Sequence, residues 1–106
     1  MTHFNLENLN AVVNKRGVRM RTVITHEHAT VKNLLLEAGD VIPFHQVEVD
    51  VFFFIIEGEG TLTIGEESVE VKPKDIVMCP PNTPMSVEAD KGESLSFLNV
   101  KTPGIE

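Results

Sequence analysis

The stretch from Val51 to Val71, VFFFIIEGEGTLTIGEESVEV, constrains the fold of this chain more than any other. It opens with a run of large apolar residues, and two glycine-containing breaks then separate segments in which apolar and polar residues alternate. β-branched and aromatic residues at a period of two favour strands, whereas glycine between them favours tight turns. The stretch therefore predicts strand, turn, strand, short turn and strand.

The same pattern extends over most of the chain. RMRTVITHEHATVKNLLLE is rich in β-branched and alternating residues, and DIVMCP, MSVEA and SLSFLNVK are separated by glycine, proline and asparagine. Short strands at such spacing are typical of an all-β sandwich or barrel. The opening segment alone predicts a short helix, because Leu6, Leu9 and Val13 recur at near-helical spacing before Gly17.

Length and composition predict one globular domain. The chain has 106 residues, of which 42% are hydrophobic and 24% charged, and this composition is ordinary for a folded domain with one core. It contains no repeat, linker or low-complexity tract. Residues 1–106 are therefore expected to form a single domain.

The charge balance disfavours nucleic acid as a partner. The formal net charge is -7, whereas nucleic-acid binding depends on neutralising phosphates. One basic cluster, NKRGVRMR from Asn14 to Arg21, interrupts the acidic background. We interpret it as a solvated loop and strand edge rather than a phosphate site, because no glycine-rich phosphate loop adjoins it.

Cysteine content and hydropathy bear on the compartment. Cys79 is the single cysteine, so no intramolecular disulfide forms and a reducing compartment is expected. The N-terminus lacks a signal-peptide pattern, and no apolar run approaches the roughly 18 residues that span a bilayer. These features predict a cytoplasmic protein with no membrane contact. The Cys79 thiol is expected to pack, with metal ligation or reactivity as alternatives.

Two motifs carry a resemblance to a known family. Gly39, His45 and Gly58 stand at the spacing of the first motif of the cupin family, and EGEGTLTIG (57–65) is very similar to its hairpin. KPKDIVMCPPNTPMSV (72–87) resembles the second motif. The resemblance covers roughly residues 34–100. It implies an all-β, double-stranded β-helix or jelly-roll barrel, with residues 1–33 packing as strands along its edge.

The resemblance also implies where a metal would bind. Cupins that hold a transition metal use three histidines and a glutamate, and these positions fall here on His45, Val47, Val51 and Met85. Valine cannot coordinate a metal, and a thioether is a weak ligand for iron, manganese or zinc. We therefore expect no metal at these positions and no cofactor.

Two alternative ligand sets would restore a divalent transition metal. Glu48 and Asp50 lie an odd number of positions from His45, so regular pleating directs them to the opposite face unless a β-bulge intervenes. His26 and His28 form an HxH pair on their own strand, and with His45 they are the second alternative. Such a pair on a strand edge is more often simply solvated.

The replacements predict an apolar pocket around one histidine. With side chains alternating along the strand, His45, Val47, Val51 and Phe53 face inward, and Met85 faces them. Either this is a filled core, or it is a pocket in which His45 orients a small apolar ligand. We favour a metal-free small-molecule-binding or non-catalytic cupin. The alternative is an enzyme: a metal-dependent oxygenase with unusual ligands, or a metal-independent isomerase using His45, although the chain has no tyrosine to serve as its acid.

The other face of the same strand predicts a partner. The same alternation directs the side chains of Phe52, Phe54 and Ile56 away from the core. Three large apolar side chains in a row are seldom left exposed. The N-terminal segment, a further sheet layer or a second subunit must cover them. Because the cupin resemblance implies that subunit contacts are common, we expect a homodimer.

Overall fold

The computed structural model describes residues 1–105. Apart from one 3-10 turn, η1 (Leu6–Asn8), the regular structure of these residues is β. The strands are β1 (Val12–Val13), β2 (Arg19–Thr25), β3 (Thr30–Leu36), β4 (Val41–His45), β5 (Asp50–Gly58), β6 (Gly60–Ile64), β7 (Glu67–Val71), β8 (Ile76–Cys79), β9 (Met85–Ala89) and β10 (Leu95–Thr102). No helix of the described residues is long and apolar enough to cross a membrane.

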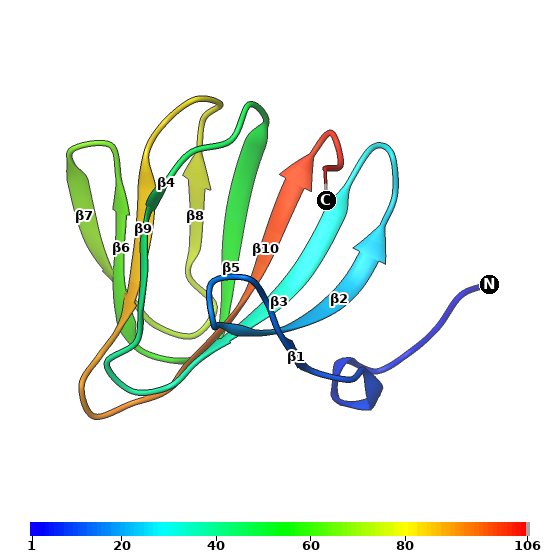
Figure 1. Cartoon of the computed structure of the whole chain (residues 1–106), viewed down its shortest axis with the longest axis horizontal. Helices are drawn as coiled ribbons and strands as arrows, with labels where there is room; N and C mark the ends of the chain where they lie inside the picture. The colour runs from blue at the N-terminus through cyan, green and yellow to red at the C-terminus, as the bar shows by residue number, and fades with distance from the viewer. Residues whose placement is uncertain (106) are drawn as a thin grey trace.

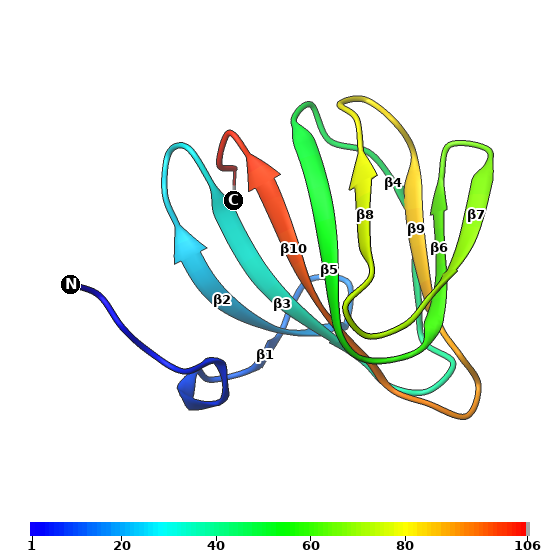
Figure 2. The ribbon, with the colours of Figure 1, turned by 180° about the vertical axis from the view of Figure 1, so that it is seen from behind.

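The strands form two antiparallel sheets that curve around a shared interior (Figure 1). The six-stranded sheet has the order β1-β2-β3-β10-β5-β8, and the four-stranded sheet has the order β4-β9-β6-β7. Figure 2 shows from behind that the strands lie closer together at the bottom of the view and spread apart toward the top. The all-β jelly-roll barrel expected from the sequence is confirmed.

The core lies between the sheets, and β5 shows how the sequence builds it. Val51, Phe53 and Ile55 are buried, whereas the alternate residues Phe52 and Phe54 are only partly buried. The predicted parity of this strand is therefore confirmed. Phe53 meets Phe97 of β10 with ring centroids 5.7 Å apart in a tilted arrangement, which favours the interaction of the two ring quadrupoles.

The break between strands that the sequence predicts at EGEG is present, and the chain changes sheets there. β5 ends at Gly58 in one sheet and β6 begins at Gly60 in the other, so the chain crosses between the sheets at Glu59. Gly58 has a φ of 84°, and a side chain there would collide with the backbone carbonyl of Ser94. The hairpin that the sequence predicts lies one strand later, where β6 pairs with β7.

Three further expectations need correction. His45 and Val51 are not on one strand, because β4 ends at His45 and residues 46–49 carry the chain from the four-stranded to the six-stranded sheet. His26 and His28 lie in the turn between β2 and β3 rather than on a strand. The opening helix is reduced to the single turn η1, whose first amides are capped by the Asn5 side chain accepting from Glu7 N at 2.9 Å.

Candidate functional site

A cavity of about 660 Å³ lies between the two sheets beside His45. This volume is within the range of small-molecule sites in proteins, roughly 300–1,000 Å³. Both sheets contribute to its apolar walls, which include Leu34, Ile42, Val47, Phe53, Val87 and Phe97. The interior is therefore only partly filled by side chains, and a ligand has apolar surface to contact.

The predicted pocket residues divide into two groups. His45, Val47 and Phe53 line the cavity. Val51 and Met85 point inward but are fully buried in the core, and neither lines the cavity. Met85 is the cross-strand partner of His45 between β9 and β4, so the sequence places it beside the site without exposing it there.

The local contacts of His45 fix its chemistry. Its Nδ1 lies 3.0 Å from the carbonyl oxygen of Pro43, which can only accept, so Nδ1 carries the hydrogen and Nε2 is left with the lone pair. Burial lowers the pKa of His45, the Pro43 hydrogen bond opposes that effect, and the charges of Arg16 and Lys101 lower it further. The imidazole is therefore held in its neutral form near neutral pH.

Four cationic side chains line the same cavity, and the sequence did not lead us to them. Lys15 and Arg16 come from the turn between β1 and β2, Lys32 from β3 and Lys101 from β10. Figure 1 shows the β1–β2 turn in front of β5 and β10, on the open side of the barrel. Burial lowers the pKa of Lys101, and the charges of Lys32 and Arg16 lower it further. Lys101 therefore lies close enough to Lys32 and Arg16 for their charges to repel one another.

The basic cluster at Asn14–Arg21 is thus only in part the solvated surface that we expected. Its first two cations line the cavity. Arg21 instead donates from Nη1 to the Asn33 side chain at 2.9 Å and from Nε to the Leu9 carbonyl at 3.1 Å. The sequence could have placed the other two cations on the inner face of the sheet. Lys32 is two residues from the inward-facing Leu34 on β3, and Lys101 is four residues from the inward-facing Phe97 on β10.

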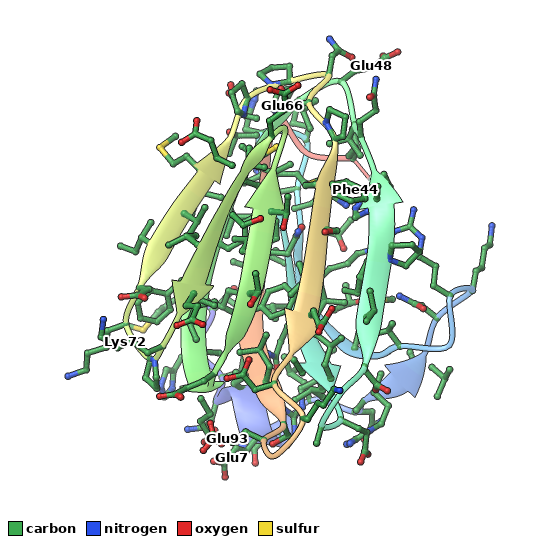
Figure 3. The ribbon with its side chains drawn as sticks, turned by 90° about the vertical axis from the view of Figure 1, so that its left-hand side faces the viewer. Glu7, Phe44, Glu48, Glu66, Lys72 and Glu93 are labelled. Carbon is green, nitrogen blue, oxygen red and sulfur yellow. The ribbon has the colours of Figure 1, made fainter. Side chains whose placement is uncertain are left out.

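The residues at the family's metal positions do not fit a transition metal. They supply one imidazole, two aliphatic side chains and one thioether, which is too few and too weak a donor set. Glu48 and Asp50 are exposed, and Figure 3 shows Glu48 near the end of the molecule where β4 leads into β5. Within residues 1–105, no group of three or more His, Cys, Asp or Glu side chains is placed to hold a metal.

The alternative histidine pair lies apart from His45. His26 and His28 have ring centroids 5.3 Å apart in an exposed turn. The amide of His28 donates to Nδ1 of His26 at 3.1 Å, and the His28 ring lies 3.3 Å from the Glu27 carboxylate. Neither ring lines the cavity. These contacts lie within the turn, and none of them involves His45.

Cys79 packs at the end of β8. Its Sγ donates to the carbonyl oxygens of Pro80 and Thr83, both at 3.5 Å, and burial raises the pKa of the thiol. The protonated form is favoured, and it is the form that reacts and binds metal poorly.

The outer face of the six-stranded sheet carries a broad apolar surface. Phe52, Phe54 and Ile56 are partly exposed there. Beside them on β8, Ile76 and Met78 are 66% and 67% exposed. The N-terminal segment does not cover these residues, because it lies beside β1 and β2 at the other edge of the sheet (Figures 1 and 2).

Comparison with known proteins agrees with this architecture. Residues 33–101 match the cupin domain family. An uncharacterised protein of Methanocaldococcus jannaschii is 31% identical over 93 residues, which cover 84% of this chain and 80% of that protein.

Solved structures of similar shape have diverged widely in sequence. KdgF from a Halomonas species superposes with a TM-score of 0.90 at 16% identity, over 100% of this chain and 96% of that one. The polyketide cyclase RemF from Streptomyces resistomycificus gives a TM-score of 0.85 at 18% identity, over 96% of this chain and 79% of that one. These likenesses show the fold alone. With the sequence match over most of its barrel, the chain belongs to the cupin domain family.

Proposed function

We propose that the protein binds a small organic molecule in the cavity beside His45, without a metal. The observation that carries this proposal is the cavity itself, which has apolar walls from both sheets and a neutral imidazole at its edge. Apolar walls with a few placed polar groups are the usual composition of small-molecule sites. His45 would orient the ligand by accepting a hydrogen bond at Nε2.

The test is an NMR titration that follows the amide signals of the labelled protein while a panel of small neutral and charged aromatic compounds is added. Binding in the cavity is expected to shift the amide signals of Val47, Phe53 and Phe97 together. Val47→Phe should narrow the cavity and weaken these shifts. Val41→Phe is the matched control, because Val41 is exposed on the preceding strand, β4, and does not line the cavity. If no compound of the panel shifts the cavity signals, the proposal fails.

A second candidate is an enzyme that transfers a proton. The lowered pKa of His45 keeps a base available at neutral pH, and the charge of Lys101 acts on that same imidazole. Lys101, whose own pKa is lowered, would take the place of the acid that tyrosine cannot supply in this chain. Solvent-hydrogen exchange into a bound carbonyl compound would test it, with His45→Gln expected to abolish the exchange.

We further propose that the protein is a homodimer and that its outer apolar face is the interface. Support comes from Phe52, Phe54 and Ile56 together with the exposed Ile76 and Met78. An apolar patch placed against its own copy brings no like charges together, which suits a two-fold contact. The free, buried thiol of Cys79 supports a reducing, cytoplasmic location, which cell fractionation would test.

A further inference from the structure

We infer that the ligand of this cavity is an organic acid: an apolar body carrying carboxylate groups that the four cations Lys15, Arg16, Lys32 and Lys101 hold. This inference rests on the proposed function, that the cavity binds a small molecule, and it names the chemical class of that molecule. The distribution of charged side chains around the cavity favours an acid over the apolar ligand that the sequence predicts.

The cations come from three separate parts of the fold and converge on one space. Lys32 and Lys101 project inward from the neighbouring strands β3 and β10, and both are partly buried. Lys15 and Arg16 are exposed on the β1–β2 turn at the open side. The whole chain has nine lysine and arginine residues, so four of them in one cavity is a strong concentration of positive charge in an acidic protein.

These cations have no internal counterion in the described structure. Within residues 1–105 the ion pairs are Glu27 with His28 and Lys72 with Asp75. No aspartate or glutamate of that part of the chain lines the cavity. Like charges that repel one another in a partly desolvated site lose that repulsion when an anion binds among them. The positive electrostatic potential of the four cations therefore favours a negatively charged ligand over a neutral one of the same shape.

Hydrogen-bonding groups lie beside the cations. Asn99 is buried, lines the cavity and stands opposite Lys32 in the register of β10 with β3. On the other side of Lys32 is a smaller hollow of about 250 Å³, lined by Lys32 and by Thr22, Thr25 and Thr30. Carboxylate oxygens accept bonds from lysine, arginine, amide and hydroxyl donors, and charged donors give the strongest of these.

The apolar walls decide between an organic acid and an inorganic anion. A phosphate ion would satisfy the cations but leave the surfaces of Phe53, Phe97 and Val47 in contact with water. An acid with a ring or alkyl body covers these surfaces at the same time. The combined lining therefore fits an amphipathic organic anion better than phosphate.

The experiment compares isophthalate with isophthalamide, its neutral analogue of nearly the same shape, by NMR titration of the labelled protein. Inorganic phosphate is titrated in parallel. We expect isophthalate to bind at least about tenfold more tightly than isophthalamide, because one charge-assisted hydrogen bond accounts for that factor. We also expect its affinity to fall as sodium chloride is added.

Variants with equal changes in net charge locate the effect. Lys101→Met and Lys32→Met, which keep an apolar stem, should each weaken isophthalate binding about tenfold and leave isophthalamide unchanged. Lys91→Met is the control, because Lys91 is exposed on the connection from β9 to β10, away from the cavity lining. If Lys91→Met weakens binding as much as Lys101→Met, the effect is general electrostatics and the inference is wrong.

The remaining outcomes separate this inference from the proposed function. Equal binding of isophthalate and isophthalamide in the cavity would overturn the choice of an acid while supporting a small-molecule site. Phosphate binding as tightly as isophthalate would overturn the organic part of the inference. If neither aromatic compound shifts the cavity signals, the acid inference falls, and the wider panel described above decides the proposed function.

Discussion

Lys32 of β3 and Asn99 of β10 stand directly opposite each other in the antiparallel register, and both line the cavity. Lys101 follows Asn99 by two residues on the same strand, so its side chain faces the same way. Two lysines and an amide thus occupy positions that would usually hold core residues in a small barrel. Their presence lowers the stability of the ligand-free protein, because polar groups are partly removed from water there.

Lys101→Met should stabilise the ligand-free protein at neutral pH. The pKa of Lys101 is lowered by burial and by Lys32 and Arg16, so the unfolded state holds this proton more readily than the folded state does. Removing the charge should raise the free energy of unfolding, on the order of 0.5 kcal/mol for a partly exposed group. Urea denaturation of the wild type and the variant at low salt measures this difference in the free energy of unfolding. A decrease, with Lys91→Met unchanged, would contradict the expectation.

Stability should fall on acidification because of His45. Its folded pKa lies below the ordinary value of 6.5, so the unfolded chain takes up the proton first as pH drops. The contribution of His45 to the free energy of unfolding is fully present above the unfolded pKa, and it is lost as pH falls from that value through the lower folded pKa. Unfolding curves from about pH 8 to about pH 5 should therefore decline more steeply for the wild type than for His45→Gln. Parallel curves for the two proteins would refute this.

Gly58→Ala should disrupt the crossing between the sheets. The residue has a positive φ, and an added Cβ would meet the backbone of Ser94, which cannot move as a side chain would. We expect a loss of at least about 2 kcal/mol in the free energy of unfolding. Gly92→Ala is the control, since Gly92 has open space around it, and its stability should be close to that of the wild type.

Elemental analysis of protein purified without a metal-affinity tag should find no stoichiometric iron, manganese, zinc, copper or nickel. The reason is the donor set at His45, Val47, Val51 and Met85. About one equivalent of metal that disappears in His45→Ala would overturn the expectation. The variant Val47→His, Val51→Glu, Met85→His should gain metal binding and be less stable without metal, because it buries polar groups.

Met78→Glu should convert the proposed dimer to a monomer. Met78 is 67% exposed on the outer face of β8, so the charge is tolerated in an isolated subunit but not in an apolar interface. Sedimentation equilibrium measures the change. Val69→Glu, on β7 of the other sheet and 46% exposed, should leave the association unchanged. A wild type that is monomeric at high micromolar concentration would show that the face has no second copy.

Local alternation predicted an all-β sandwich or barrel, and the resemblance to cupins implied that it is a jelly-roll. Alternation in β5 correctly separated Phe53 from Phe52, and the glycines marked the ends of strands. It did not predict that the chain changes sheets after His45 and at Glu59. Inward parity is the same whichever sheet a strand joins, so periodicity alone cannot reveal a crossing between sheets.

The candidate site was only partly accessible to the same reasoning. Apolar parity identified Val47 and Phe53 as cavity residues, but it could not tell them from Val51, which packs fully. Lys15 and Arg16 reach the cavity because a turn far from β5 in sequence folds back over the open side. Contacts of that kind arise from tertiary structure, and the spacing of residues along the chain cannot predict them.

The β1–β2 turn has a consequence for how the ligand preference of such a barrel could change. Lys15 and Arg16 lie in this turn and line the cavity, but neither belongs to a strand. Lys32 and Lys101, in contrast, are on β3 and β10, which pair with each other inside the six-stranded sheet. We therefore expect substitutions at Lys15 and Arg16 to alter ligand preference without altering any strand of the barrel.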